Sequence, residues 1–257
     1  MRAFRARHGP AKKHADTMHA YANPARFLKI ARALTPWLGW GGLLLIAIGV
    51  GYGLFLAPPE RYQGDSVRII YLHVPAAWLG MGGWTGIAVA SFMQLVWRHP
   101  LAVVAGRALA VPGAVFTAIC LVTGSLWGRP AWGTYWEWDG RMTSMLVLLF
   151  LYFGYIALAS AEKEKGGEGR LTAIFGIAGA VNLPIIHYSV VWWRSLHQTQ
   201  SIDIVRGQSA IAGEMLWPLL VSAVGFSLFF GAIVLMRMRA DLARTKVEAR
   251  LRRMAEA

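Results

Sequence analysis

The chain has 257 residues, of which 56% are hydrophobic and only 15% are charged, and its formal net charge at pH 7 is +13. Soluble domains are about 45–50% apolar and about 25% charged. The apolar excess falls in long uninterrupted runs that exceed the core helices of a globular protein. These features exclude a soluble enzyme, a disordered tail protein and a fibrous rod, and they indicate a polytopic helical membrane protein.

The chain contains a single cysteine, Cys120, which lies in the middle of an apolar run, and it has no C-x-x-C motif. One thiol cannot form an internal disulfide, and covalent c-type haem attachment needs C-x-x-C-H. Thiol–disulfide chemistry and a cytochrome c are therefore both excluded.

Six apolar runs are long enough to cross a bilayer, for which a helix needs about 20 residues. In chain order they cover residues 37–57, 70–97, 101–127, 142–161, 171–191 and 215–236. The second run also has room for a short interfacial lead-in before its helix. This pattern predicts an all-α integral membrane protein with six transmembrane helices. Its expected parts are a basic N-terminal tail (1–36), a membrane domain (37–236) and a charged C-terminal tail (237–257) that forms a surface helix.

The distribution of basic residues predicts how these spans are oriented. An even number of spans puts both termini on one side, and twenty of the 26 Lys and Arg residues lie on that side against six in the opposite loops. Cytoplasmic loops carry the excess of Lys and Arg, so both tails are expected in the cytoplasm. The net charge is then explained by orientation and by anionic lipid headgroups, rather than by nucleic-acid binding.

Tryptophans gather in an expected outer loop between the third and fourth runs, residues 127–141. Four tryptophans and a tyrosine lie within twelve residues there, among Gly and Pro that interrupt any simple helix. Interfacial anchoring rarely needs so many, whereas dense indole rings suit a large flat apolar ligand. The residues expected to form this platform are Trp127, Trp132, Tyr135, Trp136 and Trp138. Asp139, close to Arg141, is interpreted as a brace of the loop rather than a general acid.

Three histidines are expected at the same outer face. His73 lies at the start of the second run and His197 just beyond the fifth, and two imidazoles beside an aromatic platform are what bis-histidine coordination of haem requires. His187, three residues after Pro184 in the fifth run, is the rival. An ionisable residue at membrane depth is a functional candidate, and it could ligate iron or act as a hydrogen-bonding partner. Spacing alone does not rank His187 below His197.

Arginines on the outer side are candidates for pairing with haem propionates, because a guanidinium pairs well with a carboxylate. The candidates are Arg129, Arg141 and Arg194. The alternative, that they are ordinary surface arginines, carries equal weight.

Residues 132–139 resemble the WWD signature of the haem-handling proteins of cytochrome c maturation. Residues 71–77 and 182–198 resemble one branch of these proteins, the haem exporter protein C (CcmC) family. The resemblance runs from about residue 68 to the end of the sixth run. Tyr135 stands where many members have another tryptophan, and Glu137 stands where an apolar residue is common.

The resemblance implies a multi-pass protein of the bacterial inner membrane whose haem site faces the periplasm. It implies haem b as bound cargo, His73 and His197 as axial ligands, and a platform that runs to Asp139. The family presents haem to the periplasmic chaperone CcmE for covalent attachment, in association with the small subunit CcmD and the ABC transporter subunits CcmA and CcmB. This is a positioning role rather than conventional enzyme catalysis, although a lyase-like part in the attachment stays open.

Other function classes compete with this interpretation. A haem-exporting transporter is weakened by the near absence of ionisable residues in the spans, which contain mainly Arg107 and His187. A membrane anchor explains the tails but leaves the histidine–tryptophan constellation without purpose. A quinone-binding subunit suits aromatics and histidine, but the transmembrane histidine pairs of a b-type haem subunit are missing. Haem bound by the purified protein would separate presentation from the last two classes.

Overall fold

The computed structural model describes residues 23–193, 195–197, 202–203 and 208–256 of the chain. Six helical segments in this part are long and apolar enough to span a membrane, which confirms the predicted fold class of a multi-pass α-helical membrane protein. They are α2 (Pro24–Phe55), α3 (Ile70–Trp97), α4 (Ala102–Trp132), α5 (Gly140–Glu164), α6 (Arg170–Gly179) followed by α7 (Asn182–Trp192), and α8 (Gly213–Ala255). The 3₁₀ helix η1 (Asp65–Ile69) leads into α3, and strands β1 (Ile202–Asp203) and β2 (Gln208–Ser209) pair antiparallel before α8.

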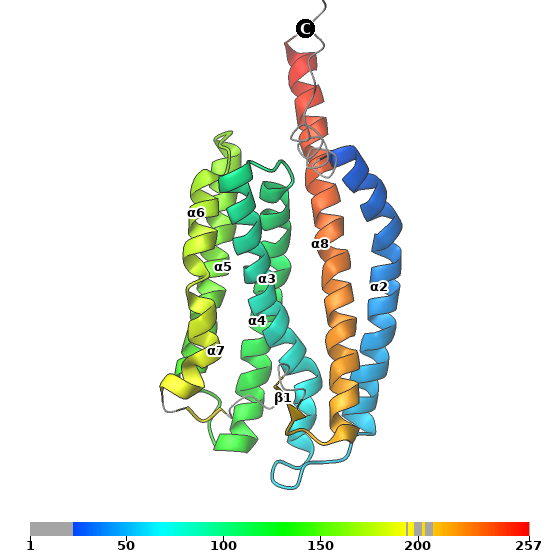
Figure 1. Cartoon of the computed structure of the whole chain (residues 1–257), viewed down its shortest axis with the longest axis vertical. Helices are drawn as coiled ribbons and strands as arrows, with labels where there is room; N and C mark the ends of the chain where they lie inside the picture. Colours follow the sequence, from blue (N-terminus) through cyan, green and yellow to red (C-terminus); the bar gives the residue numbers. More distant parts are fainter. Residues whose placement is uncertain (1–22, 194, 198–201, 204–207, 257) are drawn as a thin grey trace, which may run out of the picture.

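The helices form an up-and-down bundle (Figure 1). Helices α2 and α8 lie side by side along one flank, α3 and α4 lie in the centre, and α5 packs with α6 and α7 on the other flank. The connections 56–64 and 133–139 lie at one end, at the bottom of Figure 1, and α8 projects beyond the bundle at the other end. Among the described residues, the expected outer residues therefore lie toward one end of the molecule, and most basic residues lie toward the opposite end.

The fifth span consists of two helices, because α6 ends at Gly179 and α7 begins at Asn182. Pro184 explains the break. It has no backbone N–H, and in a regular helix its ring clashes with the carbonyl group four residues earlier, that of Ala180, which is where the helix is interrupted.

Both ends of the membrane domain extend further than hydropathy predicted. Helix α2 begins at Pro24, where the Asn23 side chain accepts a 2.9 Å hydrogen bond from the amide of Ala25 and caps the helix. Residues 24–36 are therefore helical rather than part of the tail. The expected surface helix at the C-terminus is the uninterrupted continuation of α8 to Ala255, because residues 237–255 contain neither Gly nor Pro to end it.

The expected loop 127–141 is shorter than predicted. Helix α4 continues to Trp132 and ends at Gly133, which takes the left-handed conformation (φ 81°) typical of a helix C-terminus. The irregular segment covers only residues 133–139, because Asp139 already caps α5. Trp127 and Trp132 thus extend from the last two turns of a rigid helix, and the remaining platform residues lie in the short loop.

A buried polar contact holds α3, the helix that carries His73, against α5. The hydroxyl group of Tyr152 donates a 2.7 Å hydrogen bond to the carbonyl of Gly80, and the fully buried Trp84 meets the Tyr152 ring edge-on at 5.0 Å. An aromatic pair of this geometry adds about 0.5–1.5 kcal/mol beyond the burial of its area. The core therefore fixes the helix on which the first candidate ligand stands.

Candidate functional site

His73 lies in the second turn of α3 and contacts α4. Its Nδ1 atom is 3.0 Å from the hydroxyl oxygen of Thr123. That hydroxyl already donates its proton to the helix carbonyl of Ile119 at 2.7 Å, so its oxygen acts as the acceptor for Nδ1–H of the histidine. The hydrogen bond assigns the Nδ1–H tautomer to neutral His73 and leaves the lone pair on Nε2.

His73 approaches α4 closely because Gly124 has no side chain. A Cβ atom on Gly124 would lie 2.9 Å from Cε1 of His73, closer than carbon atoms pack. On the other side, the Trp127 ring meets the imidazole edge-on, with 5.7 Å between ring centroids. The indole itself is fixed, since its Nε1–H donates a 2.7 Å hydrogen bond to the side chain of Gln63. Glycine on one side and tryptophan on the other define the orientation of the His73 ring.

His197 is held in the same manner by a carboxylate. Its Nδ1 atom lies 2.7 Å from Oδ2 of Asp139, which also accepts a 2.6 Å hydrogen bond from the hydroxyl of Ser195. The other carboxylate oxygen, Oδ1, caps α5 by accepting the amide N–H of Met142 at 2.7 Å. Asp139 thus connects the loop and the start of α5 to the segment that carries His197.

The Asp139 carboxyl group is almost completely buried, with 3% of its side chain exposed, whereas 17% of the His197 side chain is accessible. Burial raises the pKa of Asp139, but the hydrogen bonds from His197, Ser195 and the Met142 amide outweigh it and lower the pKa to about 2. The carboxylate is therefore ionised at neutral pH and accepts from Nδ1–H of His197. In a neutral imidazole, this hydrogen bond leaves the lone pair on Nε2, as in His73.

The two imidazoles form a pair suited to one metal centre. They lie close enough to interact electrostatically, and each has Nδ1 anchored and Nε2 available. Histidine ligands of metals are held in this way, with the second ring nitrogen donating to an oxygen. Within the described residues, no group of three or more His, Cys, Asp and Glu side chains could hold a metal ion. Two imidazoles alone suit an iron that brings its equatorial nitrogens with it, as haem does.

Each histidine has a tryptophan against it, and two more rings lie on the connecting loop. The Trp132 ring meets His197 edge-on at 4.7 Å, and the rings of Trp136 and Trp138 are 5.4 Å apart. Trp138 is largely exposed, while the indole Nε1–H of Trp136 is buried with no hydrogen-bond partner among the described residues. An unpartnered buried donor is costly, and it would be satisfied by an acceptor on a bound ligand.

The candidate arginines differ in their surroundings. Arg129 braces the loop: its guanidinium donates to the carbonyl of Gly133 and lies 5.6 Å from the centre of the Tyr135 ring. Arg141 interacts electrostatically with both His73 and Asp139, so its positive charge lies near one candidate ligand and near the carboxylate that holds the other. Arg194 lies outside the described residues. Of the two described arginines, Arg141 has the better position for an anionic group on a ligand held by the histidines.

His187, the rival ligand, lies on the exposed face of α7 with its ring 4.7 Å from that of Tyr188. The electrostatic partners of His73 include His197 and Arg141. Because His73 and His197 interact electrostatically, these two are taken as the proposed ligand pair.

The chain matches known proteins over most of its length. The profile of the family described as "Heme exporter protein C" matches residues 17–253. The chain belongs to the heme exporter protein C family. It is 48% identical over 223 residues to the Escherichia coli K12 protein of that name, which covers 87% of this chain and 89% of the relative. The Bradyrhizobium diazoefficiens relative is 46% identical over 233 residues (91% and 88%), and the Rhodobacter capsulatus relative is 36% identical over 230 residues (89% and 95%).

The structure adds three residues to this candidate site that the sequence did not single out. Thr123 and Ser195 anchor the site through hydroxyl groups, and Gly124 leaves room for His73. Ser195 lies within the segment 182–198 that resembles the family, but nothing in that resemblance gave it a role. Thr123 lies 50 residues from the histidine that it holds, and only the helix register, which places 123 and 124 on the face of α4 next to α3, could have indicated these two residues.

Proposed function

We propose that this chain binds haem b as cargo between His73 and His197 and presents it to a haem chaperone during c-type cytochrome biogenesis. The observation that carries the proposal is the matched anchoring of two imidazoles. Each donates Nδ1–H to a fixed oxygen, that of Thr123 or of Asp139, and keeps Nε2 for a metal. Membership of the heme exporter protein C family supports haem as the ligand.

The chain's own residues would bind and orient the cargo. Nε2 of each histidine would be an axial ligand of the iron, and the tryptophans beside them would pack against the porphyrin. Arg141 would pair with a propionate, because its positive charge lies near His73 and Asp139. The exposed Trp138 and Tyr135 would extend the platform toward a partner protein. With the ring held in this way, a vinyl edge is left for the chaperone, and the chain contributes position rather than bond-making chemistry.

The distribution of charge supports a periplasmic location for this site. The basic residues gather at the end of the bundle opposite His73 and His197, and positively charged ends of membrane proteins face the cytoplasm. We infer that the protein lies in the bacterial inner membrane with its haem site facing the periplasm. The partners proposed for it are the chaperone CcmE, the small subunit CcmD and the ABC transporter subunits CcmA and CcmB.

The platform is tested with a double substitution, Trp136→Ala with Trp138→Ala, in cells that contain the chaperone. We expect less haem to co-purify with the variant and covalent haem on the chaperone to be abolished. The matched control replaces two exposed tryptophans in the middle of α2, outside the proposed platform, Trp37→Ala with Trp40→Ala, and should load the chaperone normally. Normal loading by the Trp136/Trp138 variant would refute the proposed platform.

A further inference from the structure

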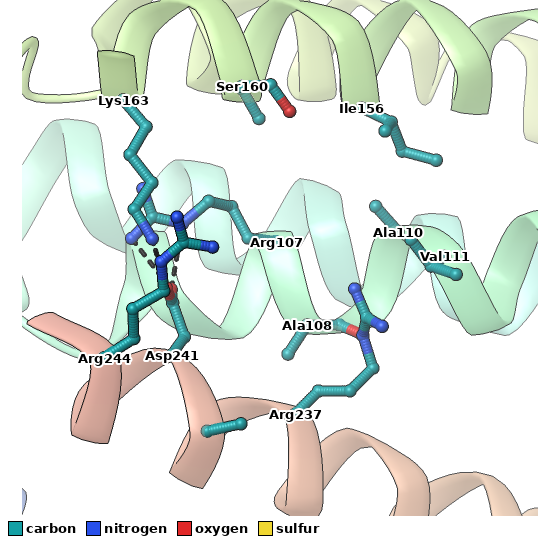
Figure 2. A pocket seen from close by; sticks show the side chains of 12 residues that line it. Arg107, Ala108, Ala110, Val111, Ile156, Ser160, Lys163, Arg237, Asp241 and Arg244 are labelled. Atoms are coloured by element: carbon teal, nitrogen blue, oxygen red, sulfur yellow. Dashed lines mark hydrogen bonds and ion pairs between the residues drawn. The ribbon is translucent and has the colours of Figure 1, made fainter.

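A cavity lies at the basic end of the bundle, far from the histidines of the candidate site. Its volume is about 380 Å³, and it is bounded by α4, α5 and α8. Four cationic side chains and one carboxylate line it, as Figure 2 shows: Arg107, Lys163, Arg237, Arg244 and Asp241. The proposed haem site uses none of these residues.

The charges in this cavity do not balance. Asp241 is shared by two cations, since one of its oxygens lies 3.0 Å from the Arg107 guanidinium and the other 2.6 Å from Nζ of Lys163. Arg237 donates Nε–H to the neutral carbonyl of Ala108 at 3.1 Å, and no ion pair of the described residues includes it. Only Arg244 has a carboxylate to itself, that of Glu248 at 2.7 Å. The cavity therefore keeps an excess of positive charge that an anion would neutralise.

The cavity changes from charged to apolar along the helix axes. Figure 2 shows Arg107, Lys163 and Arg244 around Asp241 at one side and Val111 and Ile156 at the other. Val111 follows Arg107 by four residues, which places it about 6 Å deeper in the membrane at 1.5 Å per residue.

Helix α5 repeats this direction, because Ile156 precedes Lys163 and the helix runs toward the basic end. On α8 the deeper residue is Arg237, so the cationic lining extends further along that helix. One turn deeper on α4, Val115 is 50% exposed and continues the apolar face of Val111. A cationic head with an apolar flank below it matches an amphiphile rather than a small anion.

We propose that this cavity binds the phosphate headgroup of an anionic phospholipid from the cytoplasmic leaflet, with one acyl chain along Val111 and Val115. Basic pockets between transmembrane helices on the cytoplasmic side bind such headgroups. The bound lipid connects α4, α5 and the base of the long α8, in addition to the two ion pairs of Asp241 and the hydrogen bond from Arg237 to Ala108. The proposal is independent of haem binding.

The test is native mass spectrometry of the full chain in a neutral detergent, with phosphatidylglycerol or phosphatidylcholine added at equal concentration. The wild type should retain phosphatidylglycerol in preference. Arg237→Gln should weaken that retention about fivefold, taking about 1 kcal/mol for each basic residue near an anionic lipid. Arg239→Gln removes the same charge two residues further along α8, outside the cavity lining, and should leave retention unchanged.

A second variant distinguishes lipid binding from damage to the fold. Asp241→Asn removes the carboxylate that competes for Arg107 and Lys163, so it should strengthen retention of phosphatidylglycerol, which misfolding cannot do. Equal retention of the two lipids, or equal losses in the Arg237 and Arg239 variants, would overturn the proposal. Displacement of the lipid by an equal concentration of inorganic phosphate would also overturn the proposal, because the ligand would then be a free anion. Displacement by haem would do the same, because the two propionates of haem would then be the bound groups.

Discussion

Asp139→Asn separates the two tasks of the carboxylate that holds His197. Asparagine caps helices as well as aspartate does, so its oxygen should keep the hydrogen bond from the Met142 amide. The amide NH₂ then replaces Oδ2 and faces Nδ1 of His197. Two donors cannot pair, so neutral His197 is expected to move its proton to Nε2, where it blocks the lone pair needed for iron.

The expected loss follows from the hydrogen bond that is removed. A bond to a charged acceptor contributes about 1.5–3 kcal/mol against about 0.5–1.5 kcal/mol for a neutral one. A loss of about 1.4 kcal/mol corresponds to about tenfold in affinity. This agrees with the roughly 10–100-fold cost of replacing residues that orient metal-bound histidines. We therefore expect haem affinity to fall at least about tenfold while the helical content stays unchanged.

The assay is a haem titration of the purified haem-free chain, followed by visible absorption, with circular dichroism as the check on folding. Asp65→Asn is the matched control, because Asp65 lies at the same end of the bundle but is largely exposed and pairs with Arg68. The control should bind haem like the wild type. Wild-type affinity and an unchanged spectrum in the Asp139→Asn variant would refute the role assigned to the carboxylate.

Two further substitutions test the His73 side of the site by the same titration. Thr123→Val keeps the shape of the side chain but removes the acceptor of His73 Nδ1–H, at a cost of about 1–3 kcal/mol. Haem affinity should therefore drop at least about fivefold in the valine variant, whereas Thr123→Ser keeps the hydroxyl group and should bind haem like the wild type. Wild-type affinity in the valine variant would count against the assigned tautomer. Gly124→Ala places a methyl group 2.9 Å from the His73 ring and should lower haem retention. The control is Gly82→Ala, where a Cβ atom meets nothing within 4 Å, and it should leave haem retention unchanged. Equal retention by the two alanine variants would contradict the close approach of His73 to α4.

The six helices that are long and apolar enough to span a membrane could be predicted from the sequence, because hydropathy depends only on the local composition of each segment. The first and last residues of the helices could not be predicted where capping residues, rather than hydropathy, determine them. The Asn23 cap starts α2 among charged residues, and α4 continues past Pro130 until Gly133 ends it. The break at residues 180–181 follows from Pro184. The sequence contains this proline, but the hydropathy of the segment is continuous across it and does not indicate a break.

The candidate ligands could be named from residue type and motif, but their support could not. Asp139 was expected to brace the loop and, through the resemblance, to belong to the platform; the structure shows it buried against His197, 58 residues away. Such a contact depends on how α5 and the last outer loop meet, which no local pattern encodes. The same holds for Thr123, an ordinary helix residue until α3 packs against it.

Visible absorption of the haem-loaded full chain, beside His73→Ala, His197→Ala and His187→Ala, tests the central claim most directly. The account predicts a low-spin bis-histidine spectrum for the wild type and for the His187 variant. It predicts a high-spin spectrum or loss of haem for each of the other two. A low-spin spectrum that survives in the His73 or His197 variant, or disappears in the His187 variant, would contradict the assigned pair of ligands.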